Sequence, residues 1–177
     1  MNASADFFAG SAEAGYAALG VSLLLNTAPF MLYFGQEIGE RGMDDEPFSG
    51  VNGRTSIFDW WTVESLQALR QYIDTKRKGL NAQQKAVLKR YREALELAKR
   101  PAFAEGRTFD LCYCQGEGFN PDRHFAFLRA DDAETWLVVA NFGSSADITV
   151  RIPAEAGAEP CTATLRVQEK DFVAIQI

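Results

Sequence analysis

The stretch that decides the fold covers residues 27–39 and reads Thr-Ala-Pro-Phe-Met-Leu-Tyr-Phe-Gly-Gln-Glu-Ile-Gly. Its centre, residues 30–34, is a continuous apolar run closed by Gly35, and this pattern favours a short strand buried on both faces, as in a parallel sheet. The preceding residues Ala12–Leu25 are apolar around nearly the whole circumference of a helix, which predicts a helix packed within a larger body. A helix, a short loop and a buried strand make one step of an alternating α/β architecture.

The predicted strand is followed by a polar, glycine-rich loop from Gln36 to Trp61. A loop of this length after a strand is usually functional, and in a β/α barrel it lies on the face that carries the active site. Its last two residues, Trp60 and Trp61, have two interpretations. They pack the loop onto the barrel, or they form a platform on which a sugar ring stacks.

Carboxylates are the residues of this loop that offer chemistry. Glu37 comes shortly after the predicted strand, where barrel enzymes place active groups, and Glu40, Asp44, Asp45 and Glu46 follow. Hydrolysis of a glycosidic bond needs two carboxyl groups flanking that bond, about 5–5.5 Å apart in retaining enzymes. The spacing along the chain does not establish this geometry, so the alternative is an acidic surface loop, or a loop that helps to hold a cation.

Two helices are predicted beyond the loop. Apolar residues at helical spacing indicate the first of them, at Leu66, Leu69, Tyr72 and Ile73. For the second, Asn81 and Gln84 form a capping-box pattern at the start. Lys99-Arg100-Pro101 marks its end, because cationic residues in a last turn and a following proline are stop signals.

After Phe103 the pattern changes to short strands separated by polar or Gly/Pro-bearing turns. Phe109, Leu111 and Tyr113 alternate with Asp110, Cys112 and Cys114, and further runs cover residues 124–129, 135–141, 147–152, 162–167 and 172–177. Six such strands within about seventy residues predict an antiparallel sandwich or barrel. We therefore expect an α+β chain with two domains, residues 1–103 and residues 104–177.

Cysteine and histidine usage gives little support for a metal site. Cys112 and Cys114 are expected on one face of a strand, and a metal would need the further ligands Cys161 and His124, the single histidine. The competing interpretation makes the cysteines small buried hydrophobes and His124 a surface or structural residue. We expect no metal ligand and no catalytic base among them.

Charge and hydropathy limit the classes of partner. The formal net charge of −6 disfavours nucleic acid and anionic membrane surfaces. Residues 14–36 carry no charged side chain, which is long enough for a transmembrane helix, but Asn26, Thr27 and Pro29 interrupt the run. A helix that leads into a buried strand accounts for it better, so we expect neither nucleic acid nor membrane as a partner.

Read together, these residues resemble the α-amylase family of glycoside hydrolases, family thirteen, which has a (β/α)8-barrel catalytic domain. Residues 27–39 are similar to its last barrel strand, which commonly ends in Gly-Gln-Glu, and residues 53–60 to the loop after it. Residues 91–103 resemble the final barrel helix, and residues 125–129 and 137–142 the early strands of the C-terminal β domain. The resemblance implies a terminal fragment of a (β/α)8 barrel, strand eight with flanking helices, followed by an antiparallel β-sandwich domain.

The resemblance also implies chemistry. The family hydrolyses or transfers α-glucosidic bonds with retention, by means of an Asp nucleophile, a Glu acid/base and a second Asp after barrel strands four, five and seven. The last of these lies in an Asn-His-Asp motif, which Asp6 does not match because no His precedes it, so no catalytic residue is assigned here. Gln36, Glu37 and Arg54 match family positions near the sugar-binding face, in a substrate-contacting or an architectural role. Together with the two tryptophans of the loop, the expected substrate-binding residues are Glu37, Arg54, Trp60 and Trp61. We expect no cofactor in this chain; the family's calcium site accompanies a domain inserted after the third strand, so calcium belongs to the longer protein.

We therefore expect the C-terminal part of a glycosidase that acts on starch-like α-glucans, inactive by itself. One strand and a few helices cannot close a barrel, so the apolar surface around residues 23–34 is expected to be covered by self-association or by exchange of elements between copies. One alternative is a non-catalytic carbohydrate-binding or accessory module, with Trp60, Trp61 and Trp136 as stacking residues. Another is an intact interaction protein. The sequence leaves the family member and the compartment open.

Overall fold

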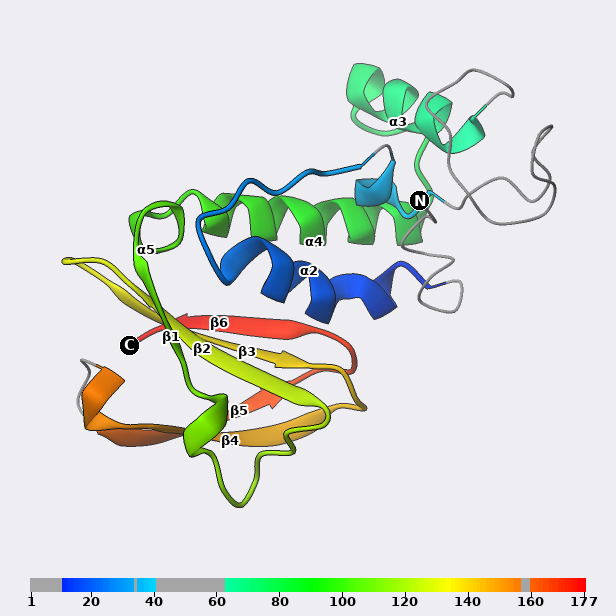
Figure 1. Ribbon diagram of the computed structural model, residues 1–177. Helices are drawn as coiled ribbons and strands as arrows, with labels where there is room; N and C mark the ends of the chain where they lie inside the picture. The colour runs from blue at the N-terminus through cyan, green and yellow to red at the C-terminus, as the bar shows by residue number, and fades with distance from the viewer. Residues whose placement is uncertain (1–10, 34, 41–62, 157–159) are drawn as a thin grey trace, which may run out of the picture. The chain divides into compact units, whose positions relative to one another are not determined.

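The computed structural model describes residues 11–33, 35–40, 63–156 and 160–177, which fall into two compact units. The helical unit comprises Met1–Gly15 and Met31–Glu93, and the β unit comprises Tyr16–Phe30 and Ala94–Ile177. Figure 1 shows the elements of each unit, which are described separately below. Within the described ranges, no helix has the length and apolar character needed to cross a membrane.

The β unit contains an antiparallel sandwich. Its larger sheet has four strands in the order β1 (Arg107–Asp110), β2 (His124–Ala130), β3 (Thr135–Asn141) and β6 (Phe172–Gln176). The smaller sheet pairs β4 (Ala146–Ile152) with β5 (Cys161–Val167). All these pairings are antiparallel, which confirms the fold predicted for the second half of the chain.

The larger sheet is covered on both of its faces. On one face, apolar side chains of β2 and β3 such as Leu128 and Val139 form a core with Ile148 and Val150 of β4. On the other lies α2 (Tyr16–Leu24), which contacts β3 and β6 (Figure 1). Burial on both faces explains why β2 and β3 are apolar at consecutive positions and do not alternate.

The approach of α2 to the sheet depends on a glycine. A Cβ atom on Gly20 would lie 2.4 Å from the ring of Phe172 in β6, a distance that real Cβ contacts do not reach. The first turn of α2 is bonded to the segment between β5 and β6, which leads into Phe172, because the N–H of Ala17 donates to the carbonyl of Lys170 at 2.9 Å. The predicted helix at Ala12–Leu25 is confirmed, as the short 3-10 helix η1 (Glu13–Gly15) followed by α2.

A buried arginine joins the larger sheet to the segments that precede it. Arg129 of β2 is 1% exposed. Its guanidinium donates to the carbonyl oxygens of Leu25, Ala102, Phe103 and Gly106 and to the hydroxyl of Thr108, at 2.6–3.1 Å. All five N–H groups of the side chain are used. The end of α2, the short helix α5 (Pro101–Ala104) and the start of β1 are thereby fixed on one strand.

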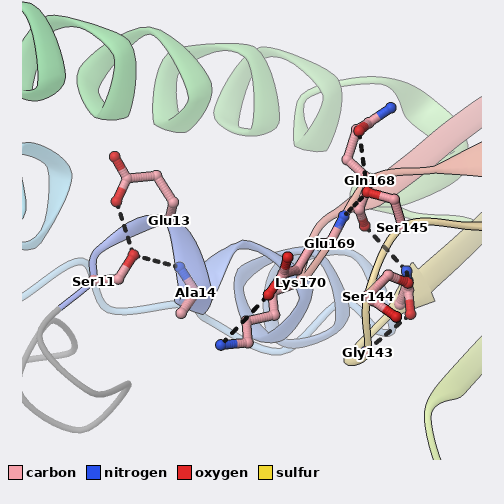
Figure 2. Close-up of polar contacts among 10 residues, drawn as sticks. Ser11, Glu13, Ala14, Gly143, Ser144, Ser145, Gln168, Glu169 and Lys170 are labelled. Carbon is pink, nitrogen blue, oxygen red and sulfur yellow. Dashed lines mark hydrogen bonds and ion pairs between the residues drawn. The ribbon is translucent and has the colours of Figure 1, made fainter.

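The turns that link the two sheets are held by a second buried polar residue, Asn141. Its amide nitrogen donates to the carbonyl oxygens of Ser144, Val167 and Gln168 at 2.8–3.4 Å. Figure 2 shows the bonds between these turns, in which Ser145 contacts Gln168 and the N–H of Glu169, and the Lys170 N–H donates to the Gly143 carbonyl. The β3–β4 and β5–β6 connections therefore form one hydrogen-bonded cluster.

The helical unit contains the 3-10 helix η2 (Gln36–Ile38), α3 (Glu64–Thr75) and most of α4 (Ala82–Ala98). Its core consists of the buried Ile38, Leu80 and Leu88 with apolar side chains of α3 packed against them. The start of α4 has the predicted capping box. Asn81 Oδ1 accepts the N–H of Gln84 at 2.8 Å, and Gln84 Oε1 accepts the N–H of Asn81 at 3.0 Å.

The strand predicted at residues 30–34 is wrong for the part that the structure describes. Residues 30–33 have no regular secondary structure, and Met31 is 71% exposed. A strand inside a parallel sheet takes its backbone hydrogen bonds from a strand on each side, and the described residues of the helical unit include no other strand. An apolar sequence cannot form a buried strand without those neighbours.

The alternating pattern at residues 109–114 also ends earlier than predicted. β1 stops at Asp110, and Cys112–Cys114 form the 3-10 helix η3. The cause is local, because Asp110 Oδ1 accepts the N–H of Cys112 at 2.9 Å. Side-chain bonds of this kind offer the backbone an alternative to the strand ladder. The two cysteines therefore do not lie on one face of a strand.

The predicted domain division into residues 1–103 and 104–177 stays a prediction. The compact units divide the chain differently, because Tyr16–Phe30 belongs by its contacts to the β unit. Periodicity indicates a buried helix in this segment, but it does not say which sheet the helix covers.

Replacement of Arg129 by methionine is expected to lower the free energy of unfolding by about 3–5 kcal/mol, because it leaves several buried carbonyl groups without donors. Urea unfolding followed by circular dichroism measures the loss. The matched control is Arg166→Met on β5, whose exposed side chain pairs with Asp147 at 3.4 Å and should contribute less than about 1 kcal/mol. Equal losses of unfolding free energy in the two variants would show that the Arg129 hydrogen bonds stabilise the fold no more than an exposed ion pair does.

Candidate functional site

The candidate site is the segment Gly35–Glu40, which contains η2. Gly35 and Gly39 flank this turn with φ angles of 73° and 69°, values that side-chain-bearing residues seldom adopt. A Cβ atom on Gly35 would also lie 2.7 Å from the Cβ of Glu40. The glycines thus permit a tight turn that presents Gln36 and Glu37 between them.

Side chains on both sides of Glu37 anchor the turn. Gln36 Nε2 donates to the hydroxyl of Tyr91 on α4 at 3.0 Å, and Gln36 Oε1 accepts the N–H of Tyr33 at 3.3 Å. Tyr91 is 3% exposed, and Ile38 is buried in the core of the helical unit. The backbone at Glu37 is therefore held from the residues before and after it.

Of the two carboxylates in this turn, Glu37 is the candidate for contact with a ligand. Its side chain is half-exposed and makes no hydrogen bond or ion pair with any described residue. Glu40, by contrast, accepts a hydrogen bond from the hydroxyl of Ser65 on α3. A single carboxylate can accept a hydrogen bond from a sugar hydroxyl, but retaining hydrolysis needs two carboxyl groups on the same bond.

The remaining substrate-binding residues predicted from the sequence are not placed beside Glu37. Arg54, Trp60 and Trp61 lie outside the described residues, as do the acidic residues 44–46. Their roles stay predictions. In the part of the chain that the structure covers, no group of three His, Cys, Asp or Glu side chains could hold a metal ion.

Trp136, the third tryptophan considered for sugar stacking, is covered by the chain itself. The guanidinium of Arg100 lies 5.0 Å from the centre of its ring, and the ring of Phe103 lies 5.7 Å away. Arg100 also forms an ion pair with Glu134 at 2.5 Å, and this contact lowers the pKa of Glu134. Trp136 therefore packs α5 against β3 and is not a free platform.

His124 and the cysteines have structural surroundings. His124 Nδ1 accepts the N–H of Asn120 at 3.0 Å, the ring lies edge-on to Phe119, and burial lowers its pKa. Cys112 and Cys114 are half-buried thiols whose sulfur atoms donate to the carbonyls of Ala126 and Leu111. None of these residues is arranged as a catalytic base or nucleophile.

Comparison with solved structures identifies the fold of the whole chain. A cyclic α-maltosyl-(1→6)-maltose hydrolase from Arthrobacter globiformis, in its ligand-free form, matches 98% of the chain with a TM-score of 0.59 and 20% identity. AmyP in complex with maltose matches 93% with a TM-score of 0.56 and 15% identity. Isomaltulose synthase from Klebsiella sp. LX3 matches 99% with a TM-score of 0.53 and 17% identity. No family profile matches the chain, and no curated protein matches it.

These solved proteins are enzymes of the α-amylase family, so the predicted resemblance is confirmed at the level of the fold. The α+β fold class is confirmed by the same comparison. The chain spans between 31% and 41% of the length of the three proteins. A shared fold at 15–20% identity does not by itself transfer an activity.

Alkylation should distinguish the three cysteines. Burial raises the pKa of Cys112 to about 11, so its thiolate is roughly one part in ten thousand at pH 7. Cys161 is exposed. We expect iodoacetamide at pH 7 to modify Cys161 well before Cys112, as measured by peptide mass spectrometry. Because the pKa is raised, the Cys112 rate should keep increasing until the pH approaches that value. Equal rates for Cys112 and Cys161 at neutral pH would contradict this environment.

Proposed function

We propose that this chain is part of an α-amylase-type glycoside hydrolase that cleaves α-glucosidic bonds in starch-like glucans. The observation that carries the proposal is the similarity of fold along 93–99% of the chain to a maltosyl-maltose hydrolase, a maltose-bound protein and isomaltulose synthase. The Gly-Gln-Glu turn supports it independently. Its glycines and its Gln36–Tyr91 bond hold the backbone of the residue that carries a half-exposed carboxylate, Glu37.

Glu37 is proposed to contact substrate without acting as nucleophile or acid. A carboxylate accepts hydrogen bonds from sugar hydroxyls, and here the backbone that carries it is already ordered, which lowers the entropic cost of binding. Arg54, Trp60 and Trp61 are proposed to complete this sugar-binding face, with the tryptophan rings offering stacking surfaces.

The catalytic carboxylates are proposed to belong to other parts of a longer enzyme. The chain spans 31–41% of the length of the enzymes it resembles, and the proposed mechanism requires a nucleophile and an acid/base about 5–5.5 Å apart. Calcium, where the enzyme uses it, is proposed to bind outside this chain. Self-association or exchange of elements is proposed for the chain alone, because Met31 and Ile73 expose apolar surface.

The purified chain is expected not to shorten maltoheptaose, because the pair of catalytic carboxyl groups is proposed to belong to other parts of a longer enzyme. Anion-exchange chromatography of the products after prolonged incubation measures this. A longer protein that contains the chain is expected to release products that are initially in the α configuration, as measured by proton NMR, because two displacements retain the configuration. Hydrolysis by the chain alone, or an initial β product from the longer protein, would refute the corresponding part of the proposal.

Weak sugar binding is expected to be detectable in the amide resonances around Glu37. Titration of the ¹⁵N-labelled chain with maltoheptaose should shift the amide resonances of residues 35–40, and Glu37→Gln should reduce these shifts because a neutral amide is a weaker acceptor. The matched control is Glu93→Gln, an exposed carboxylate on α4 paired with Lys89. If Glu93→Gln reduces the shifts as much as Glu37→Gln, the role assigned to Glu37 is wrong.

A further inference from the structure

The β unit has two hollows at the end where η3 and η4 (Ala154–Ala156) lie. The larger has a volume of about 610 Å³, and its lining includes Tyr113, Arg151, Glu155 and Thr162. The smaller has a volume of about 340 Å³, and its lining includes Phe109 and, again, Glu155. Both hollows lie within one unit and share one carboxylate.

The ring of Tyr113 is the large exposed surface beside these hollows. It is 62% exposed, which is high for a large aromatic side chain of intermediate burial tendency. Its two neighbours hold the turn against the sheets, since Cys112 Sγ donates to the carbonyl of Ala126 in β2 at 3.5 Å and Cys114 Sγ to that of Arg151 in β4 at 3.7 Å. The ring between these two anchors remains accessible to a ligand.

The turn that carries the ring is held in place by hydrogen bonds within the unit. Gln115, two residues after Tyr113, donates to the carbonyls of Leu111 and Arg151 at 2.7 and 2.9 Å, and accepts the N–H of Arg151 at 2.8 Å. These bonds attach η3 to the end of β4, which carries part of the hollow. Ordering of this kind lowers the entropic cost of binding.

Polar groups converge on the same ring. The hydroxyl of Tyr113 donates to Glu155 Oε1 at 3.1 Å, and the ring of Phe109 lies 6.3 Å away at an angle of 55°. Arg151 and Thr162, whose side chains carry hydrogen-bonding groups, also line the larger hollow. An open aromatic face beside a carboxylate, a guanidinium and a hydroxyl has the mixed character of a specific ligand site.

These groups fit a neutral sugar better than other ligands. The C–H face of a pyranose can lie on the Tyr113 ring while its hydroxyls bond to Glu155 and Arg151. An anionic ligand is disfavoured because Glu155 lines both hollows and the net charge of the chain is −6. A long apolar peptide would leave the carboxylate and guanidinium without partners.

We propose that Tyr113 and Glu155 form a binding site for an α-linked glucan chain on the β unit, distinct from the Gly35–Glu40 turn. The site binds sugar without cleaving it. The assignment to a neutral sugar follows from the hollows and their lining, whereas the choice of an α-linked glucan rests on the proposed function.

The test is calorimetric titration of the full 177-residue chain with maltoheptaose. Tyr113→Ala is expected to weaken binding about tenfold or more, because it removes the stacking surface, and Tyr113→Phe to weaken it less. Phe142→Ala is the matched control, because this aromatic side chain is 45% exposed on the same unit but lines neither hollow. Its affinity should equal that of the unaltered chain. Thermal unfolding of each variant confirms that it folds.

The outcomes separate this site from the proposed function. Shifts of the Tyr113 and Glu155 amides that persist in Glu37→Gln support the site, even if residues 35–40 do not respond. Shifts at residues 35–40 without any at Tyr113 overturn the site and leave the proposed function standing. Unchanged affinity in Tyr113→Ala, or an equal loss in Phe142→Ala, also overturns it.

Discussion

The β unit is organised around one buried positive charge. Arg129, on the inner strand β2, makes five hydrogen bonds to neutral acceptors and, among the residues that the structure describes, none to a carboxylate. Burying a cation is costly unless its donors are satisfied, so those acceptors must be held in place. Four of them are backbone carbonyls at or beyond the ends of α2 and α5, groups that a helix leaves without intrahelical partners. The charge and the helix ends therefore satisfy each other, and burial lowers the pKa of Arg129 without making it neutral at pH 7.

This constraint explains why segments distant in the sequence share one unit. Leu25 and Arg129 are 104 residues apart, yet their contact places α2 on the sheet face opposite β4 and β5. The Arg100–Glu134 pair and the Phe103–Trp136 contact then fix α5 beside β3. With both faces of the larger sheet covered, the side chains of β2 and β3 are buried on both sides. A sandwich of this size would otherwise bury only one face of that sheet.

The sequence predicts the individual helices and strands of this protein better than it predicts which elements they pack against or pair with. The run at residues 135–141 is β3 itself, and the reciprocal bonds of Asn81 and Gln84 are those of a capping box, because both patterns depend on neighbouring residues. The apolar run at residues 30–34 has the composition of a buried strand, but forming one requires other strands. At residues 112–114 the Asp110 side chain overrides the alternation.

The candidate site residues and the buried Arg129 differ in the same way in how far the sequence predicts them. Glu37 could be located from the sequence because glycines and a recognisable turn surround it. Arg129 was missed, although alternation places it on the same face as the apolar Phe125 and Phe127, and a charge in such a row is a signal of a buried network. Tyr113 was also missed as a site residue. Its exposure depends on where Cys112 and Gln115 find acceptors, and two of these acceptors, the carbonyls of Ala126 in β2 and Arg151 in β4, lie on other strands.

The sugar site proposed on the β unit matters because a glucan is a polymer. If one glucan chain binds at both proposed contacts, Tyr113 and Glu37, the second contact is an intramolecular event with a raised effective concentration. Two weak contacts to one polymer would then act together without any change in either. The β unit can supply this benefit because Gln115 and Arg129 hold Tyr113 and its sheet by interactions internal to that unit. The binding surface therefore does not depend on the order of the Gly35–Glu40 turn, and the two contacts can be altered separately.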